Sequence, residues 1–381
     1  MESVGGASGA YVSRIGRSSN RKLYSDSGKS SRSLASNTKL FTTAAYLERV
    51  GGEGRLETRL FARGRRTGGR ERTLKGALIL VGDGDPALAT PGFADQRNLP
   101  LTSLGPLARS VKDARIRTVK GDIIADPTIF DGQKTVPVPG VNPDAGDLPS
   151  LSGLSFNRGT EDGRYAQSPA KNAGDELEDE LRDIGVRVTG KVRVRGASAN
   201  TLGSAPLALM RSPTAKTLAK QTNTPSDNFY AEMLLKRLGT SRGKQGTTKR
   251  GAKRAEKFAK KAGSGVNMVN GSGLARTNTS SPRKVVKLLA HMRGDDSEKS
   301  AFFDSLAIAG KTGTLSGRMR NTAAEGSCRA KTGTISEVSA LSGYCRTGGG
   351  LVAFSILMNG VNVDSARRAQ DEMATAIARF G

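Results

Sequence analysis

The spacing of apolar residues predicts helices and strands at both ends of the chain. From about Ser36 the apolar positions repeat every three or four residues, as on one face of a helix, and the Gly-Gly pair at 51–52 ends this pattern. The same reasoning predicts a strand at 11–15, helical segments at 216–238, 250–262, from Ser281 and at 365–379, and strands at 327–331, 338–344 and 351–358. Terminal strands with helices between them indicate an α/β sandwich, and the short connections between the last strands make its sheet antiparallel.

The middle of the chain has a different pattern of apolar and turn-forming residues. Short strands and turns follow one another, for example at 78–81 and 122–124. The chain has 381 residues, more than the roughly 250 to 300 at which a single hydrophobic core stops growing. We therefore predict a main domain made of 1–62 and 201–381, interrupted by an inserted β-rich domain at 63–200.

Charge narrows the classes of partner. Lys and Arg total 60 against 35 acidic residues, so the formal net charge is +25 and the surface attracts polyanions. Nucleic acid is disfavoured, because the cations are spread from Arg14 to Arg379, aromatic residues make up only 4%, Trp is absent and no nucleic-acid-binding motif occurs. Anionic wall polymers and lipid headgroups fit the charge equally well.

Membrane segments and metal sites are limited by the same sequence. No apolar run reaches the roughly 18 residues of a membrane span, and the first ten residues lack the features of a secretory signal. His291 is the one histidine and there are two cysteines, so His-rich and Cys-rich metal sites are excluded. Asp83 and Asp85 fit a turn better than a calcium site. We expect no metal and no cofactor, and a hydrolase here would need a base other than histidine.

A lysine one helical turn after a serine can supply that base. Residues i and i+3 share a helix face, and a lysine removed from water can lose its proton near neutral pH. Ser36 and Lys39 have this spacing, as do the pairs at 168 and 171, 241 and 244, and 281 and 284. Only the first of these pairs lies on an apolar helix and is followed in order by Ser-Asp-Asn at 226–228 and Lys-Thr-Gly at 331–333. Together these are the three sequence motifs of β-lactamases and penicillin-binding proteins.

Ser168 is the strongest rival nucleophile, because its spacing to the Ser-Asp-Asn run is as compact as in simple β-lactamases. The helix after it is strongly acidic over 175–183, however, so it is expected to be solvated and unable to deprotonate Lys171. Ser281 comes after the Ser-Asp-Asn run, and with Pro282 it fits the start of a helix.

The second Lys-Thr-Gly run has a rival of its own at 311–313. That rival lies among glycines in a loop, whereas the run at 331–333 precedes an alternating strand and fits a hairpin edge. If the hairpin turns at 336–337, Cys328 and Cys345 lie directly opposite each other and a disulfide is geometrically allowed. Two separate buried thiols are the alternative.

Taken in order, these motifs resemble those of the low-molecular-mass class C penicillin-binding proteins, the D-alanyl-D-alanine carboxypeptidases and endopeptidases of peptidase family S13. The runs that match the family's pattern are ASNTKL at 35–40, VGDGDP at 81–86, LSFN at 154–157, GSGL at 271–274 and RAKTGT at 329–334. Asn270 stands where the family usually has Asp, and Leu34 where it usually has Pro. The resemblance implies a penicillin-binding transpeptidase/β-lactamase-like fold with an inserted domain.

The resemblance also implies a mechanism. Ser36 attacks the carbonyl of the penultimate D-alanine, Lys39 takes its proton, and water hydrolyses the acyl-enzyme. Ser226 relays a proton to the leaving amine, and Asn228 holds the substrate amide. The residues expected to form the strand edge and the site for the terminal carboxylate are Lys331, Thr332, Gly333 and Thr334, and the backbone N–H groups of Ser36 and Thr334 are expected to form the oxyanion hole.

The expected partners are peptidoglycan stem peptides as substrates and β-lactam antibiotics as inhibitors, with anionic wall polymers as a further candidate. An extracytoplasmic location, in the periplasm or cell wall, follows from this substrate. The two alternatives are a β-lactamase of the same fold and a non-catalytic wall-binding protein. Release of D-alanine excludes the binding protein, and slow turnover of bound penicillin excludes the β-lactamase. The sequence leaves the balance between carboxypeptidase and endopeptidase open.

Overall fold

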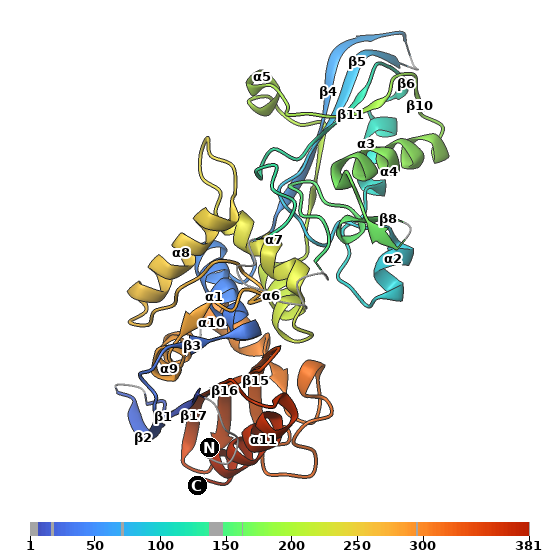
Figure 1. Ribbon diagram of the computed structural model, residues 1–381. Coiled ribbons are helices and arrows are strands. Elements are labelled where there is room, and N and C mark those ends of the chain that lie inside the picture. The colour runs from blue at the N-terminus through green and yellow to red at the C-terminus, as the bar shows by residue number, and fades with distance from the viewer. Residues whose placement is uncertain are drawn as a thin grey trace.

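Two large sheets, each with its own helices, make up the protein (Figure 1). The computed structural model describes residues 7–16, 19–69, 72–136, 148–161, 163–294 and 296–380. The first six residues, part of the segment in which the sequence predicts no secretory signal, lie outside this description. No helix in the described ranges is long and apolar enough to cross a membrane.

The six-stranded main sheet has the order β14-β15-β16-β17-β1-β2. Its strands are β1 (Ala7–Arg14), β2 (Arg21–Asp26), β14 (Ala307–Ile308), β15 (Cys328–Ile335), β16 (Val338–Thr347) and β17 (Gly350–Asn359). All of its pairings are antiparallel, as predicted, and the structure adds that the first strand, β1, lies against the last, β17. The fold class is confirmed.

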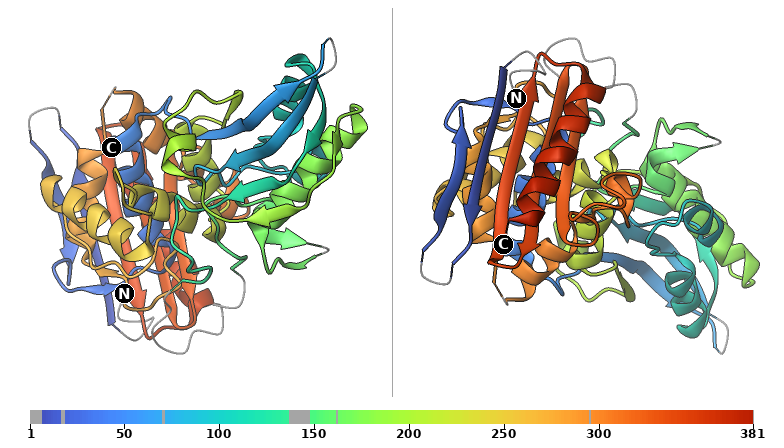
Figure 2. Two further views of the ribbon diagram at one scale, coloured as in Figure 1. Left: turned by 90° about the horizontal axis from the view of Figure 1, so that it is seen from above. Right: turned by 90° about the horizontal axis from the view of Figure 1, so that it is seen from below.

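Helices cover both faces of this sheet, and Figure 2 shows α11 (Val363–Arg379) lying across one of them. The opposite face carries a layer made of α1 (Thr38–Val50), α6 (Ala215–Asn223), α7 (Asn228–Leu238), α8 (Thr248–Lys261), α9 (Pro282–His291) and α10 (Ser297–Asp304). Strand β17 reflects this arrangement, because Phe354 and Ile356 pack on the α11 side while Ala353 and Leu357 pack on the side of the larger layer. Burial on both faces explains why this strand is a continuous apolar run.

Helix α1 lies in the centre of the larger layer and is buried on every side from residue 38 to residue 47. It ends at Gly51, whose φ of 74° suits glycine, as the Gly-Gly pair predicted. The predicted helical segment at 216–238 is two helices, α6 and α7. Pro225 has no N–H to donate, and Ser226 adopts a left-handed conformation with φ 67°, so the chain turns sharply before Asp227 caps α7.

The second sheet is mixed, with helices α3 (Gly105–Asp113) and α4 (Pro169–Asp183) packed on one face. Its strands are β4 (Glu57–Thr67), β5 (Arg72–Val81), β6 (Ile116–Lys120), β7 (Ile123–Asp126), β10 (Arg187–Val188), β11 (Val192–Val194) and β12 (Ala208–Arg211). Strand β12 returns along β4, so this sheet begins before and ends after the predicted bounds 63–200. The division of the chain into domains stays a prediction.

A disulfide joins β15 to β16. Cys328 lies opposite Cys345, and Ile335 opposite Val338, so the hairpin turns at 336–337. The sulfurs are bonded and the Cα atoms are 4.0 Å apart. The disulfide that the sequence register allowed is therefore confirmed.

Shorter elements complete the description. They are β3 (Arg32–Ser33) paired with β13 (Thr279–Ser280), β8 (Thr160–Glu161) paired with β9 (Arg164–Tyr165), the helices α2 (Pro91–Gln96) and α5 (Ala199–Leu202), and the 3₁₀ turns η2 (Ala35–Asn37), η4 (Asn157–Gly159) and η5 (Gly313–Leu315).

Candidate active site

Ser36 lies in the 3₁₀ turn η2, immediately before α1. It is half-buried, whereas its neighbours at 34–35 and 37–40 are all buried. Ala35 has a φ of 45°, which an L-residue rarely adopts, and Gly273 packs directly against its carbonyl. A Cβ atom on Gly273 would come within 1.9 Å of the Ala35 oxygen, so only glycine fits there. The close approach of Gly273 thus packs the loop at 271–273 against the turn that holds Ser36.

Lys39 lies one helical turn further on and is fully buried. Its Nζ atom is 2.8 Å from Ser36 Oγ, 2.7 Å from Asn228 Oδ1 and 2.7 Å from the carbonyl oxygen of Ser272. Desolvation lowers the pKa of Lys39 to about 7, although the charges of Glu232 and Asp227 oppose the shift. A neutral amine has two N–H donors and one lone pair. The two carbonyl-type acceptors take the donors, which leaves the lone pair for the Ser36 hydroxyl proton.

The Ser-Asp-Asn run joins this cluster through its last residue. Asn228 is the first residue of α7 and contacts Lys39 directly. Asp227 accepts from the backbone N–H of Tyr230 at the helix N-terminus and also pairs with Arg158. Ser226 is half-buried and has no hydrogen-bond partner among the described residues, so its side chain is available to a ligand.

The Lys-Thr-Gly strand lies against the same turn. The side-chain amide of Asn37 donates to the carbonyl of Lys331 at 3.0 Å. A Cβ atom on Gly333 would come within 2.8 Å of the Leu34 oxygen, so glycine lets β15 approach η2. Lys331 is fully buried, and desolvation, with a contribution from the charge of Lys39, holds its pKa well below the usual value. Of the predicted strand residues, Thr334 is exposed and reachable from solvent.

Glu232 is a member of this site that the sequence interpretation missed. It is fully buried on α7, and its carboxylate accepts the backbone N–H groups of Gly271 at 2.9 Å and of Ser272 at 2.7 Å. The carbonyl of Ser272 in turn accepts from Lys39. Burial raises the pKa of Glu232, while these hydrogen bonds and Lys39 lower it. The signal was local, because Glu232 follows Asn228 by one turn and shares its helix face.

Two further contacts come from segments that sequence reasoning set aside. The loop of the rejected run at 311–313 places Thr314 at 2.8 Å from the hydroxyl of Thr332, and its backbone N–H donates to Thr224 just before the Ser-Asp-Asn run. On α11, Arg367 donates to the hydroxyl of Thr334 at 3.3 Å. Neither contact has a short-range signal, because each joins segments brought together only by the fold.

The rival residues lie elsewhere. Ser168 precedes α4, and Lys171 forms an exposed ion pair with Asp175 at 2.7 Å. Ser281 caps α9 by accepting from the backbone N–H of Lys284, as predicted. Asp83 pairs with Arg237 at 3.0 Å and so joins the second sheet to α7.

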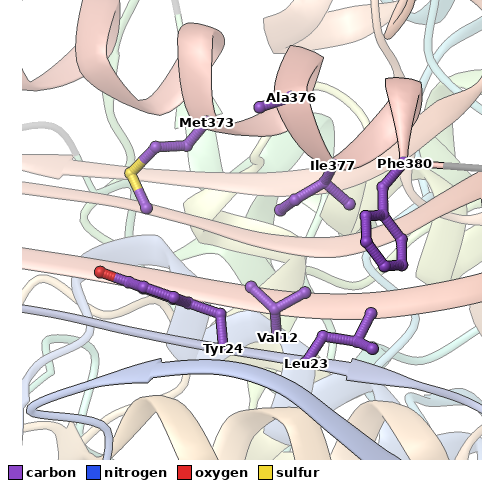
Figure 3. A pocket seen from close by; sticks show the side chains of 7 residues that line it. All are labelled: Val12, Leu23, Tyr24, Met373, Ala376, Ile377 and Phe380. Atoms are coloured by element: carbon purple, nitrogen blue, oxygen red, sulfur yellow. The ribbon is translucent and has the colours of Figure 1, made fainter.

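An apolar groove of about 430 Å³ lies between α11 and strands β1 and β2 (Figure 3). Its lining residues are Val12, Leu23, Tyr24, Met373, Ala376, Ile377 and Phe380. It contains no charged side chain and none of the residues of the Ser36 cluster, so it is not the candidate active site.

The fold and this cluster define a class of protein. A serine and a buried lysine one turn apart, flanked by a Ser-Asp-Asn loop and a Lys-Thr-Gly strand, are the arrangement of a penicillin-binding serine enzyme. The sequence model of the D-Ala-D-Ala carboxypeptidase 3 (S13) family matches residues 2–145 and 155–380, and the chain belongs to this family. The predicted enzyme class, a serine-type D-Ala-D-Ala peptidase, is confirmed by this membership.

Individual relatives agree with this assignment. The chain is 29% identical to a D-alanyl-D-alanine carboxypeptidase of Actinomadura sp. (strain R39) over 99% of its own length and 82% of that protein. It is 26% identical to a carboxypeptidase of Mycobacterium tuberculosis, over 90% of this chain and 74% of that one. Among solved structures, penicillin binding protein 4 of Haemophilus influenzae has a TM-score of 0.79 at 20% identity, with 97% of both chains covered, which shows the shared fold.

Proposed function

We propose that this protein cleaves the D-alanyl-D-alanine ends of peptidoglycan stem peptides, with Ser36 as nucleophile and Lys39 as its base. The observation that carries the proposal is the 2.8 Å contact between Lys39 Nζ and Ser36 Oγ, made by a lysine whose pKa burial lowers to about 7. A general base is most effective when its pKa lies near the working pH. The exposed pair of Lys171 with Asp175 offers nothing comparable.

In the proposed reaction, acylation of Ser36 precedes deacylation by water. The proton of Ser36 passes to Lys39 as Oγ bonds to the carbonyl carbon of the penultimate D-alanine. The C–N bond then breaks, and the leaving amine receives a proton by way of Ser226, whose hydroxyl is free to take part. Water attacks the resulting ester and releases the shortened peptide.

Substrate binding is assigned to the neighbouring strand. Thr332, Gly333 and Thr334 on β15 would hold the peptide, and Lys331 and the loop of Thr314 support this edge from behind. Arg367 beside Thr334 places a cation where the terminal carboxylate is expected. Charge-assisted hydrogen bonds from arginine to a carboxylate are about twice as strong as neutral ones.

A direct test uses penicillin and intact mass. One covalent adduct per chain, located by peptide mapping on Ser36, would support the acyl-enzyme. Release of D-alanine from a stem pentapeptide would separate a peptidase from a wall-binding protein, and slow loss of the adduct would separate it from a β-lactamase. An unmodified mass after prolonged incubation would contradict the proposal.

The pH dependence of acylation is expected to follow Lys39. The neutral amine is the active form, so the second-order rate constant for penicillin acylation should rise as the pH increases through about 7 and level off above it. Stopped-flow or mass measurements between pH 5 and pH 9 would show this rise. A rate constant that falls between pH 6 and pH 8 would exclude a lysine base with this pKa.

Replacing Glu232 by glutamine is expected to move that midpoint to lower pH. The amide keeps a similar shape, but the negative charge that raises the pKa of Lys39 is lost. Glu256→Gln is a matched control, because Glu256 also accepts a backbone N–H, that of Met268 at 2.8 Å, without contacting the Ser36 cluster. We expect the control to leave the midpoint unchanged, and an equal midpoint in both variants would remove Glu232 from the mechanism.

We further infer that the segment at 63–200 is an inserted domain that braces α7. Three ion pairs connect its loops to this helix and its cap: Arg158 with Asp227, Asp131 with Lys236 at 2.6 Å, and Asp83 with Arg237. Lys236 is fully buried, whereas its partner Asp131 is 30% exposed. Because α7 carries Asn228, the insertion supports the site from outside.

An extracytoplasmic setting agrees with this function. Stem peptides lie in the wall, and β-lactams reach an enzyme that works there. A disulfide also persists in such an oxidising compartment. The charge of +25 adds anionic wall polymers as a candidate partner.

Cleavage of a terminal D-alanine and cleavage of a D-alanyl cross-link need the same acyl-enzyme. Both activities are therefore assayed, on a stem pentapeptide and on a cross-linked peptide.

A further inference from the structure

Helix α8 concentrates positive charge on one surface. Seven of its fourteen residues are Lys or Arg, and Glu256 is its one acidic residue. The inward face is made of small residues and Phe258, and Gly251 packs so closely on α7 that a Cβ atom would meet the Leu235 oxygen at 2.0 Å. The outward lysines, all exposed, are Lys249, Lys253, Lys257, Lys260 and Lys261. Figure 1 shows α8 at the outer side of the helical layer, away from the second sheet.

The charges of this helix are not balanced within the protein. Lys261 lies 3.7 Å from Glu48, but Lys249, Lys253, Lys257 and Lys260 have no ion-pair partner in the described part of the chain. Glu256 is occupied by the backbone of Met268. Lysines four residues apart repel each other, and cations in the first turn oppose the helix dipole. The helix dipole favours Lys260 and Lys261 in the last turn, but it gives no reason for Lys249 and Lys253.

A cleft of about 520 Å³ adjoins the charged face, between α8 and the C-terminal half of α1. Three apolar residues line it, and the charged residues of its lining are five cations and one carboxylate, that of Glu48, which lies 3.7 Å from Lys261. The apolar residues are Ala45, Leu238 and Phe258, and the cations are Arg49, Arg254, Lys257, Lys260 and Lys261. Such a cleft can admit one anionic group of a longer chain lying along the helix.

Two arginines in this cleft are held in place without a carboxylate. Arg49 donates to the carbonyl oxygens of Leu238 at 3.0 Å and of Thr240 at 2.9 Å. Arg254 donates to the same two oxygens. Among the described residues neither guanidinium has an acidic partner, so two like charges are fixed side by side by neutral groups. An anion placed between them would relieve their repulsion.

This surface is separate from the Ser36 cluster. Ser36 precedes α1, whereas Glu48 and Arg49 lie at its other end, about 18 Å away at 1.5 Å per residue. An extended ligand on α8 would therefore leave the Ser36 hydroxyl accessible.

We propose that α8 and the cleft beside α1 form a second binding site, for the phosphodiester chain of an anionic wall polymer. Successive lysines at 249, 253 and 257 are about 6 Å apart along the helix, which gives a row of cations for a row of phosphates. Arginines suit phosphate because their planar fork binds two oxygens. The choice of a wall polymer over nucleic acid rests on the proposed function, but the existence of the site does not. The site would hold the enzyme on the wall while Ser36 works on nearby peptides.

Three matched proteins test the site. The first carries Lys253→Gln, Lys257→Gln and Lys260→Gln on α8. The second carries the same change in charge on exposed lysines of the second sheet and its helix: Lys75→Gln, Lys112→Gln and Lys120→Gln. The third is Ser36→Ala, which separates binding from catalysis. Binding to purified poly(glycerol phosphate) teichoic acid is measured over a range of salt, and thermal unfolding shows that each variant is folded.

The α8 variant is expected to bind at least about tenfold more weakly at low salt and to show a shallower salt dependence, by about two units of slope. The variant of the second sheet should stay within about twofold of the parent, and Ser36→Ala should bind as the parent does. Lys257→Gln alone should lose about two- to threefold, which gives a readout if the triple variant folds poorly. Equal losses in the two triple variants would mean diffuse attraction and overturn the proposal. Tighter binding of a single-stranded oligonucleotide with the same number of phosphates would assign the site to nucleic acid instead.

Discussion

Ser36→Ala is expected to abolish both covalent labelling by penicillin and release of D-alanine. Without the hydroxyl no acyl-enzyme forms, and loss of a nucleophile typically costs more than about 10³-fold in rate. The protein should fold normally, because Ser36 is half-buried and, within the described ranges, its hydroxyl hydrogen-bonds to Lys39 alone. Intact mass after incubation with penicillin and an assay for free D-alanine measure the two losses.

Ser168→Ala is the matched control, because Ser168 has the same spacing to a lysine. It should label and hydrolyse within about twofold of the parent, the usual range for a surface substitution away from a site. Lys171 is exposed and paired with Asp175, so its ammonium form is stabilised instead of its neutral form. Full labelling of the Ser36→Ala protein, with loss in the Ser168→Ala protein, would overturn the assignment of the nucleophile.

Lys39→Ala is expected to lower the rate of acylation by about 10²- to 10⁴-fold, the usual contribution of a general base. Ser36 would remain, but a hydroxyl without a base is a weak nucleophile at neutral pH. The change also leaves Asn228 Oδ1 and the Ser272 carbonyl without their donor, at a cost of about 1–3 kcal/mol for each buried acceptor that water does not reach. The rate of penicillin acylation at pH 8 and the thermal midpoint separate these two effects.

Lys171→Ala removes the lysine of the rival pair and should change neither the rate nor the stability beyond the small effect of an exposed helical ion pair. The two lysines thus differ in burial and not in spacing. If Lys39→Ala acylated within tenfold of the parent, the base would have to be another group, and Lys331, buried on the strand that contacts the same turn, is a candidate.

Contacts within one helical turn or one hairpin could be predicted from the sequence, because residues close in sequence are also close in space there. Ser36 and Lys39 share a helix face, so their contact follows from spacing. The disulfide follows from the hairpin register, since a turn at 336–337 pairs residue 328 with residue 345. The acidic helix after Ser168 also showed at once that Lys171 would be solvated.

The break within 216–238 shows where a local pattern was misleading. Apolar spacing alone continues through this segment, although Pro225 ends a helix and Asp227 begins one. The break matters for the proposed function, because it leaves Ser226 in the connection between the two helices and puts Asn228 at the start of α7.

By itself the sequence determined the family, the order of the three motifs and the antiparallel sheet, and it gave the prediction that Ser36 and not its rivals is the nucleophile. Only the tertiary structure decided what surrounds Lys39. Lys39 donates to Asn228 and Ser272, which lie 189 and 233 residues further along the chain. Glu232 holds the backbone of Ser272, and the strand of Lys331 packs on the same turn through Asn37. A pKa depends on desolvation and on charges within a few ångströms, so it is set by the folded structure and cannot be read from the spacing of residues along the chain.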